Sequence, residues 1–181
     1  MTILLTAESF GLGPVTTILD VAHSLRSRNG ETDLHYIGDA FTCQHVRTQE
    51  PWLKCTEISA GQPLSSLGTK GKDLWVVGMD QKSAAELVGS GHRVIFYDLL
   101  AWFWDSTPQP VVDGATWLCQ DFYGVAQTVQ KAHDDTLEAH LVRRVPARCA
   151  TQTPLPEQHY TLINLGGIYN PLLDEKTLVA Y

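Results

Sequence analysis

Short apolar runs alternate with segments of helical periodicity along most of this chain, and this alternation limits what the chain can fold into. Thr2–Thr6 is rich in β-forming residues, and from Pro14 onward apolar residues recur every three or four positions. Leu74–Val77 is continuously apolar, as in a strand that is buried on both faces. Strand–helix alternation with short connections predicts βαβ units, and therefore a parallel sheet with helices on both faces.

The same pattern predicts individual elements. The predicted strands are Thr2–Thr6, Leu34–Ile37, Leu74–Val77, Arg93–Tyr97 and Trp117–Cys119, with a further short strand at Thr56–Ile58. The predicted helices run from Pro14 to Asn29–Gly30, over Gln81–Val88 before Gly89 and Gly91, and over Phe122–Ala132, with His133–Arg144 continuing the last one or forming another. The rest of Phe41–Lys72 shows no regular period. The predicted fold class is α/β: a Rossmann-like three-layer α/β/α domain with a mainly parallel sheet.

A change in composition predicts a domain boundary near the C-terminal end. Residues 148–159 are rich in Thr, Pro and Gln, as is typical of an extended linker. Tyr160–Leu165 then predicts a new strand, which ends in Gly166–Gly167. We therefore expect a Rossmann-like domain over 1–147, a linker over 148–159, and the opening strand and loop of an incomplete second domain over 160–181.

Charge and composition exclude several classes of function. The chain has 13 basic and 20 acidic residues, and a net charge of -7 disfavours nucleic-acid binding. The four cysteines form no C-x-x-C pair and the histidines no metal-binding pattern, so we expect no metal site. No apolar stretch is long enough for a membrane span, and the first residues lack a basic signal-peptide region, so a cytoplasmic location is expected.

The loop after the first predicted strand is one candidate site, because ligands of open α/β sheets sit outside the carboxyl ends of the strands. Its glycines, Gly11 and Gly13, allow close approach of a ligand to the backbone, and Glu8 and Ser9 supply polar side chains. The spacing matches neither the G-x-G-x-x-G fingerprint nor a P-loop. A purely structural glycine turn is the alternative interpretation.

Two further loops are candidates on the same reasoning. After the predicted strand Arg93–Tyr97 come two carboxylates and two indoles, which suit hydroxyl protons and sugar faces respectively: Asp98, Trp102, Trp104 and Asp105. The strand that ends in Gly166–Gly167, with Tyr169 and Asn170 in the loop after it, could bring backbone N–H groups near a diphosphate. A packed aromatic loop and a plain tight turn are the structural alternatives.

The order of these parts resembles the N-terminal half of the GT-B glycosyltransferases. The resemblance lies in a strand, Gly-rich loop and helix over Ile3–Asn29, a buried strand and helix over Leu74–Val88, the loop Asp98–Asp105, and a linker that leads to the strand and glycine turn Leu162–Gly167. It implies an N-terminal domain that binds the acceptor, a C-terminal domain that binds a nucleotide-sugar, and reaction in the cleft between them without a bound metal or cofactor.

The resemblance also implies residue roles. The base that deprotonates the acceptor often lies in the loop after the first strand and is often His; here Glu8 is the titratable side chain in that loop, and Asp98 is the second candidate. The predicted acceptor-binding residues are Ser9, Gly11, Gly13, Trp102, Trp104 and Asp105. The predicted donor-binding residues are Asn164, Gly166 and Gly167. Without most of the donor domain, this chain alone is expected to show no transferase turnover.

Two other functions fit the same pattern. One is a stand-alone Rossmann-like module that binds a nucleotide or a partner protein, in which case the last strand could pair with a second copy to form a homodimer. The other is a sugar-nucleotide epimerase or hydrolase of the same architecture. The mass of the native protein separates the first from a two-domain transferase, and product analysis separates the second, since an epimerase needs no acceptor.

Overall fold

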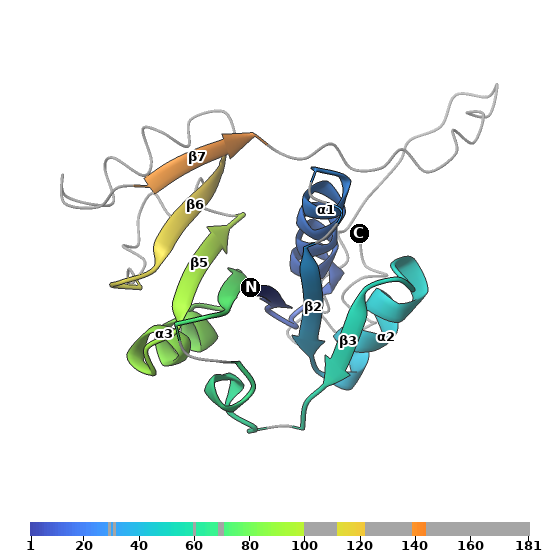
Figure 1. Ribbon diagram of the computed structural model, residues 1–181, viewed down its shortest axis with the longest axis horizontal. Coiled ribbons are helices and arrows are strands. Elements are labelled where there is room, and N and C mark those ends of the chain that lie inside the picture. Colours follow the sequence, from blue (N-terminus) through green and yellow to red (C-terminus); the bar gives the residue numbers. More distant parts are fainter. Residues whose placement is uncertain are drawn as a thin grey trace, which may run out of the picture.

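Seven parallel strands form one sheet in the part of the chain that the structure describes. This computed structural model describes residues 1–28, 30, 32–59, 61–68, 71–99, 112–121 and 139–143. The strands are β1 Thr2–Ala7, β2 Asp33–Gly38, β3 Lys54–Glu57, β4 Leu74–Gly78, β5 Arg93–Asp98, β6 Thr116–Asp121 and β7 Ala139–Arg143. Their order across the sheet is β3-β2-β1-β4-β5-β6-β7, and every neighbouring pair is parallel. Figure 1 shows β5, β6 and β7 side by side, and β3 beside β2.

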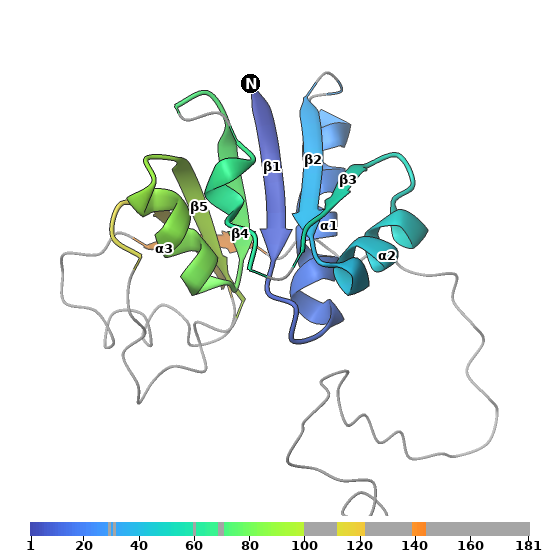
Figure 2. The same ribbon diagram turned by 90° about the horizontal axis from the view of Figure 1, so that it is seen from below.

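The direction of strand addition reverses at β1. This strand pairs with β2 on one side, where Leu4 lies opposite His35, and with β4 on the other, where Leu4 lies opposite Trp75. Figure 2 shows β1 between β4 and β2. The chain therefore has a topological switch point between β1 and β4, and a crevice opens outside the carboxyl ends of the strands at such a point.

Helices cover both faces of the sheet, as the alternating pattern predicts. Helices α1 (Leu12–Arg28) and α2 (Ala40–Gln49) share one apolar cluster, in which Ile18 and Val46 are fully buried. Helix α3 (Gln81–Gly89) and the short 3₁₀ helix η1 (Leu64–Ser66) belong to a second cluster around Trp75 and Leu87. The predicted three-layer α/β/α class is confirmed, with the two clusters on opposite faces of the sheet.

Two elements differ from the sequence prediction. Residues 40–49 form helix α2 inside a region that showed no regular period, because Asp39 caps the helix and Thr42, Cys43 and Val46 turn inward. The helix predicted over His133–Arg144 is wrong at its C-terminal end, where Ala139–Arg143 is strand β7. Parallel pairing of this segment with Trp117–Asp121 of β6 outweighs its local helical tendency.

Other predicted elements agree closely with the structure. The strand predicted at Thr56–Ile58 is β3, which begins two residues earlier. The helix predicted over Phe122–Ala132, the linker 148–159 and the segment 160–181 lie outside the described residues. Across the parts of the chain that are described, none of the helices has the length and apolar character needed to cross a bilayer.

Candidate functional site

A cleft of about 550 Å³ opens at the carboxyl ends of β1, β2 and β4. Thr6, Ala7, Glu8 and Ser9 line it from the end of β1, and Gly38, Asp39 and Thr42 from the end of β2 and the first turn of α2. The opposite wall comes from the segment between β3 and η1 and from α3: Ile58, Gly61, Gln62, Pro63, Leu64, Asp80, Lys82, Ser83 and Glu86. The cleft therefore lies at the switch point, where this topology places ligands.

Glu8 is the titratable side chain that β1 delivers to the cleft. Its backbone N–H donates to the carbonyl of Gly78 at 2.8 Å, which ties the loop after β1 to the end of β4. Partial burial raises the pKa of the Glu8 carboxyl above its ordinary value, and the negative charge of Asp80 raises it further. The backbone N–H of Ser9, 3.1 Å from Oε1, acts in the opposite direction.

Asp80 caps the N-terminus of α3. Its Oδ1 accepts from the backbone N–H of Ser83 at 2.9 Å, and its Oδ2 accepts a short bond from the Ser83 hydroxyl. Both carboxylate oxygens are thus engaged by the first turn of the helix. Asp80 holds a fixed negative charge at this wall of the cleft, beside Glu8.

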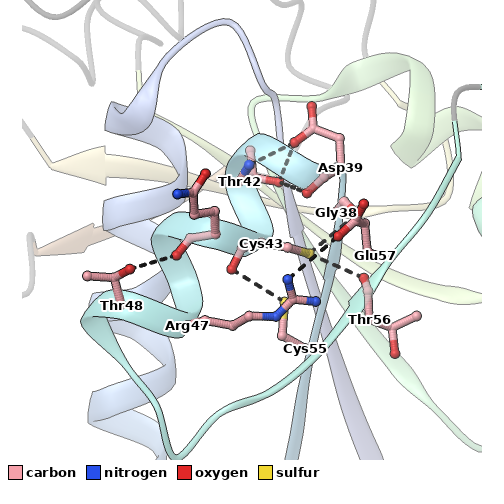
Figure 3. A network of polar contacts seen from close by, with 10 residues as sticks. Gly38, Asp39, Thr42, Cys43, Arg47, Thr48, Cys55, Thr56 and Glu57 are labelled. Carbon is pink, nitrogen blue, oxygen red and sulfur yellow. Dashed lines mark hydrogen bonds and ion pairs between the residues drawn. The ribbon is translucent and has the colours of Figure 1, made fainter.

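Asp39 plays the same part at α2 (Figure 3). Its Oδ1 accepts from both the backbone N–H and the hydroxyl of Thr42, each at 2.8 Å. Behind this cap, the buried thiol of Cys43 donates to the carbonyl oxygens of Gly38 and Thr56, both at 3.4 Å. These bonds join α2 to the ends of β2 and β3, so the Asp39 wall of the cleft is held by three elements.

Glu86 connects α3 to η1 on the far wall. Its Oε1 accepts from the backbone N–H of Ser65 at 3.1 Å and from the Ser65 hydroxyl at 2.7 Å. The carbonyl of Ser65 in turn lies 3.1 Å from Nε2 of the buried His92. This polar chain fixes the segment that faces the loop after β1.

Met79 sits at the end of β4 in a conformation that glycine usually adopts, with φ of 65°. Its N–H donates to the carbonyl of Tyr97 at 3.0 Å, and its sulfur accepts from the N–H of Leu99 at 3.1 Å. The left-handed residue turns the chain from β4 toward the Asp80 cap. Backbone strain of this kind is concentrated at functional sites.

The structure brings together some of the predicted site residues and separates others. Glu8 and Ser9 line the cleft, whereas Gly13 belongs to the first turn of α1, which begins at Leu12, and neither Gly11 nor Gly13 lines the cleft. Asp98 is fully buried at the end of β5, with β4 between it and β1.

Asp98 has a different neighbourhood from the cleft. It lies opposite Cys119 of β6 in the strand register. Burial, and after it the charge of Asp98, raises the pKa of the Cys119 thiol to about 12. The remaining predicted residues, Trp102, Trp104, Asp105, Asn164, Gly166 and Gly167, lie outside the described residues.

Sequence reasoning missed several cleft residues, although a signal for them exists. Both Asp39 and Asp80 follow a strand and precede a hydroxyl residue by three positions, as Asp39-x-x-Thr42 and Asp80-x-x-Ser83. An Asp followed at that spacing is the pattern of a helix N-cap, and here it also marks the rim of a parallel sheet. No comparable signal identifies Glu86, whose position depends on the packing of α3 against η1.

Neither a metal centre nor a family assignment defines the site. Among the described residues, no group of three or more His, Cys, Asp and Glu side chains is arranged to hold a metal ion. Comparison of the chain with protein-family models, with curated proteins and with solved structures finds no match.

Proposed function

We propose that this chain is the acceptor-binding half of a cytoplasmic glycosyltransferase, with Glu8 as the base that takes the proton of the acceptor hydroxyl. The observation that carries the proposal is the Glu8 carboxyl, which lies in the switch-point cleft with its pKa raised by burial and by Asp80. A carboxylate whose pKa moves toward the working pH is a stronger general base.

In the proposed reaction, an acceptor oxygen forms a bond to the anomeric carbon of the sugar. The bond from that carbon to the nucleotide diphosphate breaks, and the diphosphate departs with the electron pair. The proton of the acceptor hydroxyl passes to Glu8, which releases it to water afterwards. Asn164, Gly166 and Gly167 remain the proposed contacts of the donor diphosphate, and Trp102, Trp104 and Asp105 the proposed further contacts of the acceptor.

The fixed surroundings of Glu8 support this role. Its backbone is tied to Gly78, and the Asp80 charge beside it is held by two bonds from Ser83. A base has to reach within about 3 Å of the proton that it removes. A carboxylate whose backbone is held by the central strands meets this requirement more readily than one on a mobile surface segment. The hydroxyl of Ser9 offers a further hydrogen bond to an acceptor hydroxyl from the same cleft.

The test is a transfer assay on the native polypeptide purified from its source cells, with a panel of nucleotide-sugars. We expect Glu8→Gln to lower kcat by about 10²- to 10⁴-fold with little change in KM, because general base catalysis contributes that much. Glu57→Gln is the matched control, since Glu57 is half-exposed and pairs with Arg47 away from the lining of the cleft. Equal turnover of Glu8→Gln and wild type would remove Glu8 from the mechanism.

One observation favours a second candidate, a Rossmann-like module that binds a nucleotide. Asp39 comes directly after β2, the second strand, and in dinucleotide-binding sheets an acidic residue some way beyond the glycine turn accepts a ribose hydroxyl. Calorimetric titration with NAD and with UDP distinguishes the two functions. Binding in the absence of any acceptor, weakened by Asp39→Asn, supports the module, and the acceptor-domain proposal expects neither effect.

A further inference from the structure

The lining of the cleft carries more negative than positive side chains, and this excess affects which acceptor can bind. Among the described residues that line the cleft, four carry carboxylates and one carries an ammonium group: Glu8, Asp39, Asp80, Glu86 and Lys82. A bound phosphate, sulfate or carboxylate would therefore face several negative charges within one confined space. Such like charges in a cleft with protein walls are screened less than on an open surface.

At two helix N-termini that face the cleft, a capping carboxylate also occupies one backbone donor. Helix N-termini bind phosphate through their free N–H groups. At α2 the N–H of Thr42 is taken by Asp39, and at α3 the N–H of Ser83 is taken by Asp80. The caps of α2 and α3 thus place a carboxylate at two helix ends where a phosphate-binding sheet presents free N–H groups.

An apolar rim stands beside these charges. Exposed large apolar side chains in the described part of the chain are Met1, Phe10 and Phe41, with exposed fractions of 73%, 42% and 53%. Phe10 follows the cleft residue Ser9, and Phe41 lies between the cleft residues Asp39 and Thr42. Because β1 and β2 are parallel neighbours, both residues lie at the same edge of the sheet as the cleft, next in the chain to residues that line it.

Taking the proposed function as its basis, we propose that the cleft selects an acceptor that is neutral or bears an amine and that carries an apolar group, and that it rejects anionic acceptors. The hydroxyls of the acceptor enter the acidic cleft toward Glu8, and its apolar group lies against Phe10 and Phe41. The carboxylates of Asp39 and Asp80 act as specificity determinants through their charge. The diphosphate of the donor is held outside this cleft.

The test measures binding to the 181-residue chain by following the backbone amide signals of Ser9, Thr42 and Ser83 in NMR spectra. The probes are phenyl β-D-glucopyranoside, its 2-amino-2-deoxy analogue and its 6-phosphate. We expect the neutral and amine probes to shift these signals, and the phosphate probe to bind at least tenfold more weakly at low salt. The difference shrinks at high salt, because screening weakens the repulsion.

A double variant tests whether the cleft charges cause the selectivity. Asp39→Asn with Asp80→Asn keeps both helix caps, since Asn caps as well as Asp, but removes two charges. We expect it to bind the phosphate probe at least threefold more tightly than wild type and the neutral probe unchanged. Asp33→Asn with Asp113→Asn removes the same charge outside the cleft, as Asp33 begins β2 at the opposite edge of the sheet, and should leave the selectivity intact.

The contribution of Phe10 and Phe41 is tested separately, with a probe that lacks the phenyl group. Phe10→Ser with Phe41→Ser should weaken phenyl β-D-glucopyranoside about two- to tenfold, the range of an aromatic stacking contact, and leave methyl β-D-glucopyranoside unchanged. Since both rings are exposed, the variant retains its core.

The proposal is overturned if the phosphate probe binds wild type as tightly as the neutral probe, if the neutral probe leaves the three amides unshifted, or if the control charge variant alters selectivity as much as the cleft variant. This binding test needs no turnover. Selective binding without transfer by the native polypeptide would contradict the proposed transferase function and support the proposed selectivity. Transfer to phosphorylated acceptors would support the transferase function and contradict the selectivity.

Discussion

The position of Glu8 favours the proposed catalysis but lowers the stability of the folded protein. Burial and the charge of Asp80 raise the pKa of its carboxyl, so the folded protein holds the Glu8 proton more tightly than the unfolded chain does. Between the ordinary value of 4.5 and the raised value, the folded state binds more protons, and the free energy of unfolding falls as pH rises through that window. At neutral pH the ionised side chain therefore lowers stability.

Replacing Glu8 should consequently stabilise the protein while removing the proposed base. We expect Glu8→Gln to unfold at higher urea concentration than wild type at pH 7, and the difference to disappear well below pH 4.5, where the carboxyl is protonated in both states. Urea titrations at several pH values measure this. An equal gain at pH 4 and pH 7 would show that the effect does not come from ionisation.

Gly78 illustrates how tightly α1 packs against the centre of the sheet. A Cβ at this position would lie 2.7 Å from Cγ1 of the fully buried Ile18, and 3.5 Å from the Cβ of Ala7. We expect Gly78→Ala to destabilise by about 1–3 kcal/mol, because overpacking a filled core forces side chains or backbone to move.

Gly89 provides the matched control for that substitution. It is the last residue of α3, and a Cβ there would meet nothing within 4 Å. Gly89→Ala should be neutral or stabilise by up to about 1 kcal/mol through the better helix propensity of alanine. Thermal or urea unfolding of the pair tests the contrast, and equal losses in both would mean that the crowding at Gly78 relaxes.

At the scale of elements, the two helices that face the cleft depend on carboxylate caps. Asp80→Ala removes the bonds to Ser83 and should cost about 0.5–2 kcal/mol, whereas Asp80→Asn should cost little because the amide oxygen still accepts from the backbone N–H. Both variants lose the same charge, so the difference between them isolates the cap. If Asn were as costly as Ala, charge rather than hydrogen bonding would stabilise the helix end.

The elements also show which parts of the fold a sequence can predict. Strands β1, β4 and β5 were predictable because burial on both faces requires continuous apolar runs such as Leu74–Gly78. Helix α2 was not, because it presents few apolar residues, and one of them, Phe41, is exposed. The pattern over His133–Arg144 predicts a helix where β7 lies, because a strand of five residues is too short to show a periodic signal of its own.

The candidate site was predictable to a lesser degree. The rule that ligands lie beyond the carboxyl ends of parallel strands led to Glu8 and Ser9, which line the cleft. It also led to Asp98, which follows the same rule but is buried, because side-chain direction at a strand end depends on register rather than on composition. Asp39 and Asp80 each stand three positions before a hydroxyl residue, which predicts a helix N-cap but does not by itself indicate a cleft.

At the scale of the whole molecule, the sheet separates two apolar clusters that should respond independently to substitution. Ile18 belongs to the cluster under α1 and α2, and Leu87 to the cluster under α3; both are fully buried. We expect Ile18→Val to cost about 0.5–1.5 kcal/mol and Leu87→Ala about 2–5 kcal/mol. The double variant should lose the sum to within about 0.5 kcal/mol, since the sites share no partners.

Urea unfolding of the wild type, both single variants and the double variant gives this cycle directly. The four free energies of unfolding can be compared directly if the m value, which reflects the surface exposed on unfolding, is the same in all four proteins. A coupling well above 0.5 kcal/mol would indicate that the sheet transmits strain from one face to the other.

The central place of β1 has a consequence for how the chain is synthesised. Its first neighbour, β2, emerges from the ribosome soon after it. Its second neighbour is β4, in which Leu74 pairs with Ile3, and β4 emerges only after β2, α2 and β3 have been made. At bacterial or eukaryotic rates of elongation, one edge of an apolar strand stays open for a time on the order of seconds. During that interval the nascent chain is a substrate for chaperones. Only when β4 has been synthesised can it pair with the open edge of β1 and complete the centre of the sheet.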